Sequence, residues 1–383
     1  MSVTAAQGFQ AAGIAAGIKE NGNPDLALVV NNGPRLAAAG VFTSNRVKAA
    51  PVLWSEQVLK SGQVSAVILN SGGANACTGP KGFQDTHATA EKVAEVLDVN
   101  AGDVAVASTG LIGVLLPMDK LLPGVESAAA QLSAHGGEKA AIAIKTTDTV
   151  HKTSVHTGDG WTVGGMAKGA GMLAPGLATM LVVLTTDADL DSETLDRALR
   201  AATRTTFDRV DSDGCMSTND TVLLLASGAS AVTPEYAEFA EAVRKVCDDL
   251  GQQLIRDAEG ASKDIKIEVV NAASEEDAVE VGRSIARNNL LKCAIHGEDP
   301  NWGRVLSAIG TTGAAFEPDQ LNVAINGVWV CKNGGVGEDR ELVDMRYREV
   351  HIVADLAAGS QTATIWTNDL TADYVHENSA YSS

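Results

Sequence analysis

The chain has 383 residues, of which 45% are hydrophobic, so it is long enough for two domains or subdomains with sizeable cores. Its net charge of −19 at pH 7 repels phosphate backbones and anionic lipid, which excludes nucleic acid and membranes as expected partners. Five scattered cysteines form no CxxC pair, and the first 25 residues have no basic start and no long apolar core. The sequence therefore predicts a cytoplasmic protein with reduced thiols, no structural zinc and no signal peptide.

Short apolar runs, many of them β-branched, predict strands along the whole chain. The expected strands are Leu26–Val30, Ala66–Asn70, Val104–Ser108, Thr179–Thr185, Thr221–Ala226, Ile265–Val270, Leu291–Ile295, Leu321–Ile325, Val350–Val353 and Thr362–Trp366. Helical periodicity lies between them, at about 83–98, 119–133, 192–206, 234–258, 275–289 and 303–309. This mixture predicts an α/β or α+β fold of layered sheets and helices.

Two features bear on how the chain is divided. The glycine-rich loop at 156–178 is the expected boundary between its parts. The segments 181–227 and 267–311 share a weak strand–acidic turn–helix pattern, which leaves an internal duplication open.

Several common catalytic motifs are absent: the chain has no GxxxxGK[ST], GxSxG, HExxH or EF-hand loop. The seven histidines do not cluster at metal-ligand spacing, and His151 and His156 are expected to be solvated.

The stretch "KGAGMLAPGLATMLVVL", from Lys168 to Leu184, joins a loop of glycine and proline to a strand at Thr179. A threonine at that junction can simply begin the strand. It can also be a nucleophile, if cleavage of the Ala178–Thr179 bond gives it an α-amine that serves as its base. That amine has an ordinary pKa near 8, so its neutral form is accessible.

Seven motifs in order along the chain resemble the ornithine acetyltransferase family of arginine biosynthesis, also called glutamate N-acetyltransferases. They are "NSGGANACTG" (70–79), "ASTGLIG" (107–113), "TTDT" (146–149), "GGMAKGAGMLAPGLATML" (164–181), "DSDGCMSTNDT" (211–221), "HGEDPNWGR" (296–304) and "ENSAYSS" (377–383). The resemblance covers almost the full chain.

The resemblance implies that the precursor cuts itself between Ala178 and Thr179. Residues 1–178 would then form an α chain and residues 179–383 a β chain with Thr179 as its N-terminal nucleophile. Thr109 and Gly110 match the oxyanion-hole pair, and a hydroxyl and an N–H at a strand end suit that task. On spacing alone, "STG" is equally typical of a turn that ends a strand.

The family's substrate contacts match Thr146, Lys168, Thr179, Glu259, Asn378 and Ser383, with Thr147 and Thr149 open as alternatives to Thr146. Lys168 can hold an α-carboxylate, or it is a solvated loop lysine. Glu259 is expected to end the long helix, where a carboxylate is disfavoured unless it has a function, such as pairing with the side-chain ammonium of ornithine or assisting proton transfer. Asn378 and Ser383 lie in a tail that would ordinarily be frayed.

The activity implied is ping-pong transfer of acetyl from N2-acetylornithine to glutamate through acetyl-Thr179, with acetyl-CoA as a second candidate donor. No metal or organic cofactor is required. The implied fold is an α/β sandwich of β-layers between helices, as in self-cleaving aminopeptidases, and the implied assembly is two α and two β chains. A self-processing amidase or aminopeptidase, a non-catalytic binding protein and an acyltransferase paralogue of secondary metabolism stay open.

Overall fold

A computed structural model of the protein describes residues 2–174 and 180–380. The chain forms two compact units. The first contains the residues up to Asp208 together with Cys215–Asp257, and the second contains Arg209–Gly214 and the residues from Ala258 onward. The boundary expected at 156–178 is therefore wrong, because this segment contains the strand 162–168, which pairs with strand 152–157 before it and with strand 181–186 after it in one sheet of the first unit.

The first unit contains two sheets. One has the order β1-β2-β4-β5, with strands β1 (Phe9–Ile14), β2 (Leu26–Asn31), β4 (Ala66–Asn70) and β5 (Val104–Ser108). The other has the order β3-β9-β8-β7-β6, with strands β3 (Ala37–Phe42), β9 (Thr221–Ala226), β8 (Leu181–Thr186), β7 (Thr162–Lys168) and β6 (Lys152–Thr157). The pairs β4–β5 and β8–β9 are parallel, and the other pairs are antiparallel.

Alternation of side chains along the strands gives each sheet two buried faces. In β2, Ala27 and Val29 join a core that also contains Leu181 and Val183 of β8, so the two sheets share this core. Leu26 and Leu28 point the other way, into a second core with residues of the helices. Layered packing of this kind explains why the strands are apolar on both faces.

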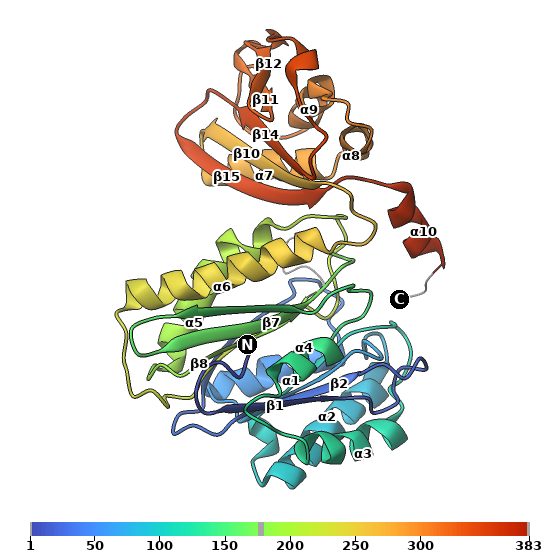
Figure 1. Cartoon of the computed structure of the whole chain (residues 1–383), viewed down its shortest axis with the longest axis vertical. Helices are drawn as coiled ribbons and strands as arrows, with labels where there is room; N and C mark the ends of the chain where they lie inside the picture. The colour runs from blue at the N-terminus through green and yellow to red at the C-terminus, as the bar shows by residue number, and fades with distance from the viewer. Residues whose placement is uncertain (1, 175–179, 381–383) are drawn as a thin grey trace. The chain divides into compact units, whose positions relative to one another are not determined.

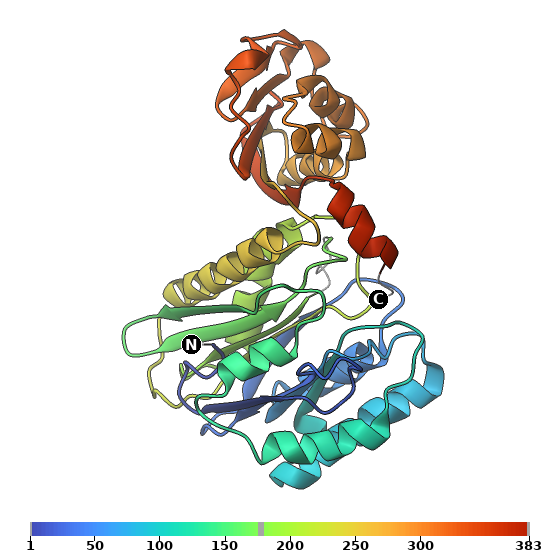
Figure 2. The ribbon, with the colours of Figure 1, turned by 45° about the vertical axis from the view of Figure 1, so that its right-hand side comes forward.

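The α-helices that the structure describes beside these sheets are α1 (Ala50–Val58), α2 (Gly79–Leu97), α3 (Met118–Ala129), α4 (Gly137–Ala143), α5 (Ser192–Thr205) and α6 (Tyr236–Arg256). Helices α2 and α3 cover the outer face of the four-stranded sheet, and α5 and α6 lie against the five-stranded sheet (Figure 1). Figure 2 shows the same stacking of helices and sheets from a second side. In α6 the buried face repeats at Phe239, Val243, Val246 and Leu250, as the periodicity predicts.

The second unit is built on one six-stranded sheet of order β13-β12-β11-β14-β10-β15. Its strands are β10 (Asp264–Ala272), β11 (Asn322–Ile325), β12 (Val328–Lys332), β13 (Gly335–Val336), β14 (Glu349–Asp355) and β15 (Gln361–Asn368), and its helices are α7 (Glu275–Ala286), α8 (Asn289–His296), α9 (Trp302–Ile309) and α10 (Ala372–Ala380). Ile267 and Val269 of β10 pack with Val281 and Ile285 of α7 in a single apolar core.

The predicted mixed α/β class is confirmed, with two corrections. The run Leu291–Ile295 is helix α8 and not a strand, because the side chain of Asn288 accepts the N–H of Leu291 and starts a helix there. The segments 181–227 and 267–311 also do not fold alike: the first returns to strand β9, whereas the second continues into α8 and α9. Among the described residues, no helix is both long and apolar enough to cross a membrane.

Candidate functional site

Three of the motifs meet at the carboxyl ends of the parallel strands β4 and β5. The amide of Asn70 donates to Ser108 Oγ over 2.6 Å. The Asn219 amide donates to the carbonyl oxygens of Ala74 and Ser108, over 2.6 and 2.8 Å. Asn219 is buried. The side chain of Ser108, the last residue of β5, is thus bonded to Asn70, and its carbonyl oxygen is bonded to Asn219.

Thr109 and Gly110 follow directly after β5. The N–H of Thr109 donates to the carbonyl oxygen of Asn70 over 3.0 Å, which continues the pairing of the two strands. Gly110 has φ of +129°, and a Cβ there would stand 2.8 Å from the backbone nitrogen of Gly73. Only glycine fits this combination of positive φ and close backbone approach, so the position of the Gly110 peptide is tightly defined.

Lys168 is the last residue of β7 and is 2% exposed, so it is not the solvated loop lysine that the sequence allowed. Its ammonium donates to Thr109 Oγ1 over 3.2 Å. Because the threonine oxygen accepts this bond, the hydroxyl proton stays available for a second acceptor. The antiparallel register places Lys168 opposite Leu181 of β8, two residues after position 179.

Thr146 lies in the turn after α4, and its N–H donates to Asp148 Oδ2 over 3.0 Å. The hydroxyl of Thr149 instead donates to the carboxylate of Asp257, so Thr149 and Thr146 are held by two different carboxylates. Asp148 Oδ1 also accepts the N–H of Gly169 over 2.7 Å, which links the Thr146 turn to the residue after Lys168.

Asp148 is buried, and burial alone would raise the pKa of its carboxyl. The charges of Lys168 and Lys152, with hydrogen bonds from Lys152 and the Gly169 N–H, outweigh burial and lower that pKa to about 2. The group is therefore a carboxylate throughout the neutral range, and it faces Lys168 as a fixed negative charge.

A second buried carboxyl holds the start of β8. Asp220 Oδ1 accepts the N–H of Met180 over 3.1 Å, and the Met180 carbonyl accepts the N–H of Thr221. Asp220 is fully buried, and desolvation raises its pKa well above the ordinary value. Both backbone groups of Met180, the residue after the predicted nucleophile, are thus hydrogen-bonded. Ala178 and Thr179 themselves, like Ser383, lie outside the described residues.

In the second unit, the Asn378 amide of α10 donates to Glu259 Oε2 over 2.9 Å. The two predicted substrate contacts of this unit are therefore neighbours. The tail that sequence alone would call frayed is helix α10, and Thr371 Oγ1 ties its start to the carbonyl of Gly260 over 2.6 Å. Glu259 does not end the long helix: α6 ends at Arg256, so the argument from an unfavourable helix terminus does not apply to it.

A cavity of about 230 Å³ lies beside Glu259 within the second unit. Its lining is mostly polar and charged: Ser212, Asp213, Gly214, Glu259, Arg287, Asn289, Lys292, Asp369, Leu370 and Tyr374. Burial lowers the pKa of Lys292, while the nearby carboxylates oppose this shift. The cavity thus presents charges of both signs, which suits a small zwitterionic ligand.

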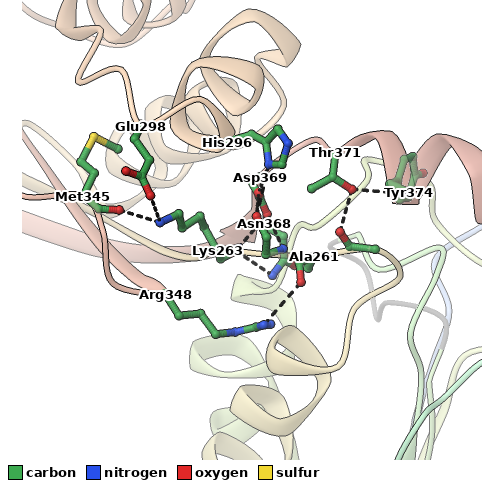
Figure 3. A network of polar contacts seen from close by, with 12 residues as sticks. Ala261, Lys263, His296, Glu298, Met345, Arg348, Asn368, Asp369, Thr371 and Tyr374 are labelled. Carbon is green, nitrogen blue, oxygen red and sulfur yellow. Dashed lines mark hydrogen bonds and ion pairs between the residues drawn. The ribbon is translucent and has the colours of Figure 1, made fainter.

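A hydrogen-bonded network holds the wall of this cavity in place (Figure 3). Asp369 Oδ1 accepts the N–H of Lys263 over 2.8 Å, and Asp369 Oδ2 lies 3.0 Å from His296 Nδ1. The Lys263 ammonium contacts Glu298 Oε1 over 3.0 Å and the Met345 carbonyl over 2.5 Å. The "HGEDPNWGR" motif therefore contributes to the framework behind the cavity through His296 and Glu298.

The structure brings together the predicted residues Thr109, Gly110, Thr146 and Lys168 in the first unit, and Glu259 and Asn378 in the second. It adds residues that sequence reasoning did not select, namely Asp148, Lys152, Asn219 and Asp220. Three of these lie within the motifs "TTDT" and "DSDGCMSTNDT", but nothing in either motif distinguished them from their neighbours.

Comparison with known proteins agrees with the motifs. The model of the ArgJ family matches residues 10–383. The arginine biosynthesis bifunctional proteins ArgJ of Streptomyces avermitilis and Streptomyces coelicolor are 92% and 88% identical over 383 residues, covering all of this chain and all of each relative. A solved ornithine acetyltransferase from Mycobacterium tuberculosis, complexed with ornithine, is 61% identical over 47% of this chain and 96% of that chain, with a TM-score of 0.45. The chain therefore belongs to the ArgJ family.

Proposed function

We propose that the chain is the ornithine acetyltransferase of arginine biosynthesis that its family membership indicates, and that it works through Thr179 after cutting itself at Ala178–Thr179. Thr179 Oγ would attack the Ala178 carbonyl, and the C–N bond would break as the nitrogen takes a proton. Water would then hydrolyse the resulting ester to the Ala178 carboxylate and the free Thr179 hydroxyl. Residues 1–178 and 179–383 would then be separate chains, and Thr179 would carry a free α-amine.

The transfer itself is a double displacement. Thr179 Oγ attacks the acetyl carbonyl of N2-acetylornithine, and its proton passes to the Thr179 amine. The bond to the substrate nitrogen breaks as that nitrogen is protonated, which releases ornithine and leaves acetyl-Thr179. The amine of glutamate then attacks the ester, giving N-acetylglutamate and the free hydroxyl.

The observation that carries this proposal is the bond from Lys168 to Thr109 Oγ1, opposite the start of β8. A buried ammonium that donates to the threonine oxygen supports a role for the Thr109 hydroxyl as a donor to a developing oxyanion, beside the Gly110 N–H. Glu259, on the cavity of the second unit, is the proposed contact for the side-chain ammonium of ornithine. Thr146, Asn378 and Ser383 complete the proposed substrate contacts.

Further parts of the proposal concern the donor, the assembly and the location. The relatives are called bifunctional, which supports a second acetyl donor, acetyl-CoA, for the same acetyl-Thr179. An assembly of two α and two β chains is proposed from the family resemblance, and native mass spectrometry tests it. The net charge and the five cysteines, none of which forms a disulfide within the described residues, support a cytoplasmic location.

Intact mass spectrometry of the denatured protein is the first test. Two species that add up to the precursor plus one water, the heavier beginning at Thr179, are expected for the wild type. Thr179→Ala should give one uncut chain, whereas the matched control Thr179→Ser keeps a hydroxyl and should still cut. A wild type that stays whole after purification would remove the basis for a free amine at Thr179.

An assay with N2-acetylornithine, with and without glutamate, separates the transferase from a self-processing amidase. Release of ornithine that depends on glutamate, with one N-acetylglutamate formed per ornithine, is the expected result. Release of free acetate at the same rate without glutamate would favour the amidase instead.

A further inference from the structure

Asp148 is a buried carboxylate that joins two separate segments of the first unit. Its Oδ1 accepts the Gly169 N–H and the Lys152 ammonium, each over 2.7 Å, and its Oδ2 accepts the Thr146 N–H over 3.0 Å. The side chain is fully enclosed. A carboxylate with three charge-assisted or backbone bonds of this length holds its partners firmly.

The two joined segments carry two of the proposed substrate contacts. Thr146 is one contact, and its own N–H is held. Lys168 is the other, and the peptide that follows it donates through Gly169. A movement of either peptide would shift a substrate-binding side chain, and a misplacement of about 1 Å can reduce catalysis by about 10²-fold.

Asp148 also lies among other buried charges. The Lys152 ammonium, 0% exposed, contacts Asp148 Oδ1 and also Asp257 Oδ2 over 2.5 Å. The charges of Lys168 and of the half-buried Lys19 also act on Asp148. Asp257 is also negatively charged and also bonds the Lys152 ammonium. It accepts the backbone N–H of Thr149, over 3.1 Å. The two carboxylates therefore share the task of neutralising Lys152 and differ in which peptide N–H groups they hold.

We propose that Asp148 is a positioning residue for catalysis, which sets the distance between Thr146 and Lys168 by accepting from the peptides beside them. This inference rests on the proposed function, in which Lys168 and Thr146 contact the substrates. N2-acetylornithine and glutamate both carry an α-carboxylate, which Lys168 can hold, so a displaced Lys168 must affect both half reactions.

The test compares Asp148→Asn with the matched variant Asp257→Asn. Kinetics are measured for both substrates, per molecule of cut enzyme counted by intact mass, and thermal unfolding is followed in parallel. In Asp148→Asn we expect kcat/KM to fall by about 10²-fold for both substrates, since an amide cannot accept every bond that the carboxylate accepts. In Asp257→Asn a fall of less than about tenfold is expected, although the melting temperature of both variants drops.

A double variant decides whether charge or position matters. The double variant Asp148→Asn with Lys152→Met removes the ammonium that would otherwise lose the Asp148 charge. Lys152→Met alone keeps Asp148, which still accepts the N–H groups of Thr146 and Gly169. Persistent loss of kcat/KM in the double variant, with Lys152→Met alone near the wild type, supports positioning. Recovery in the double variant, or equal losses in Asp148→Asn and Asp257→Asn, would overturn it. If Asp148→Asn does not fold, the double variant alone still distinguishes charge from position. A wild type without acetyl transfer would refute the proposed function instead.

Discussion

Gly110 provides the sharpest test of the proposed oxyanion hole, because a substitution cannot delete its backbone N–H but can displace it. At Gly110 a Cβ would lie 2.8 Å from Gly73 N, 3.0 Å from Gly73 Cα and 3.1 Å from the carbonyl carbon of Gly72. All three atoms belong to the backbone, so no side chain can rotate away. Gly110→Ala must therefore move the peptide that carries the proposed donor.

The same loop supplies the control. Gly113 also has positive φ, +82°, but a Cβ there meets nothing within 4 Å. Gly113→Ala thus carries the conformational penalty of alanine at positive φ, about 1–2 kcal/mol, without the collision. Gly110→Ala carries that penalty and the displacement of the backbone as well.

The expected effect on catalysis follows from the lost donor. Removal of one oxyanion-hole donor typically lowers kcat by about 10²–10³-fold. We expect Gly110→Ala to lose kcat in that range with little change in KM, and Gly113→Ala to stay within about threefold of the wild type. Steady-state assays with N2-acetylornithine and glutamate, together with melting curves of both variants, measure the two effects separately.

Equal kcat values in the two glycine variants would refute the assignment of Gly110. If Gly110→Ala cannot be purified, Thr109→Val tests the other proposed donor, since valine keeps the shape of threonine and lacks its hydroxyl. A Thr109→Val enzyme with the kcat of the wild type would contradict the oxyanion role of this pair.

Three further variants test other parts of the site. Lys168→Met removes the donor to Thr109 Oγ1, so kcat should fall by about 10²-fold in the transfer assay; unchanged kcat would mean that the bond has no catalytic role. The Asp148 carboxyl, with its pKa lowered from 3.8 to about 2, contributes about 2 kcal/mol of stability that is complete above about pH 4 and is lost as the pH falls towards 2. Urea unfolding from pH 4 to 2 should thus be less pH-dependent in Asp148→Asn, and identical acid limbs would contradict this. Glu259→Gln keeps an acceptor for Asn378 but loses the charge, so KM should rise about tenfold for N2-acetylornithine and stay unchanged for glutamate; equal changes for both substrates would argue against an ammonium contact.

Elements with a strong local pattern could be predicted from the sequence. The run from Thr179 predicted a strand that the structure describes as Leu181–Thr186, and the apolar periodicity at 234–258 predicted α6. Strand β3, with the sequence Ala-Ala-Ala-Gly-Val-Phe, was missed because alanine and glycine have little preference for strands. Its position is instead determined by pairing with β9 along all six residues, which no local pattern reveals.

The residues of the candidate site also fall into those that the sequence could predict and those that it could not. Thr109, Gly110 and Lys168 were selected because they match motifs of the family. Asp148 and Asp220 were not, because each accepts a backbone N–H from a distant segment, Gly169 for Asp148 and Met180 for Asp220, and a backbone donor leaves no residue type to recognise. The burial that shifts their pKa values depends on tertiary packing, so it also has no signature in the sequence.

The order of the five-stranded sheet determines what the proposed cut would do to the fold. Cleavage between Ala178 and Thr179 would assign β3, β6 and β7 to the α chain and β8 and β9 to the β chain. In the order β3-β9-β8-β7-β6, the β-chain strands lie between α-chain strands, with β3 pairing to β9 and β7 pairing to β8 along whole strands. Leu181 and Val183 of the β chain are also buried in a core with Ala27 and Val29 of the α chain. Separation would expose this core and break two ladders at once, so the proposed cut would release the amine of Thr179 and leave the paired strands β7 and β8 in place.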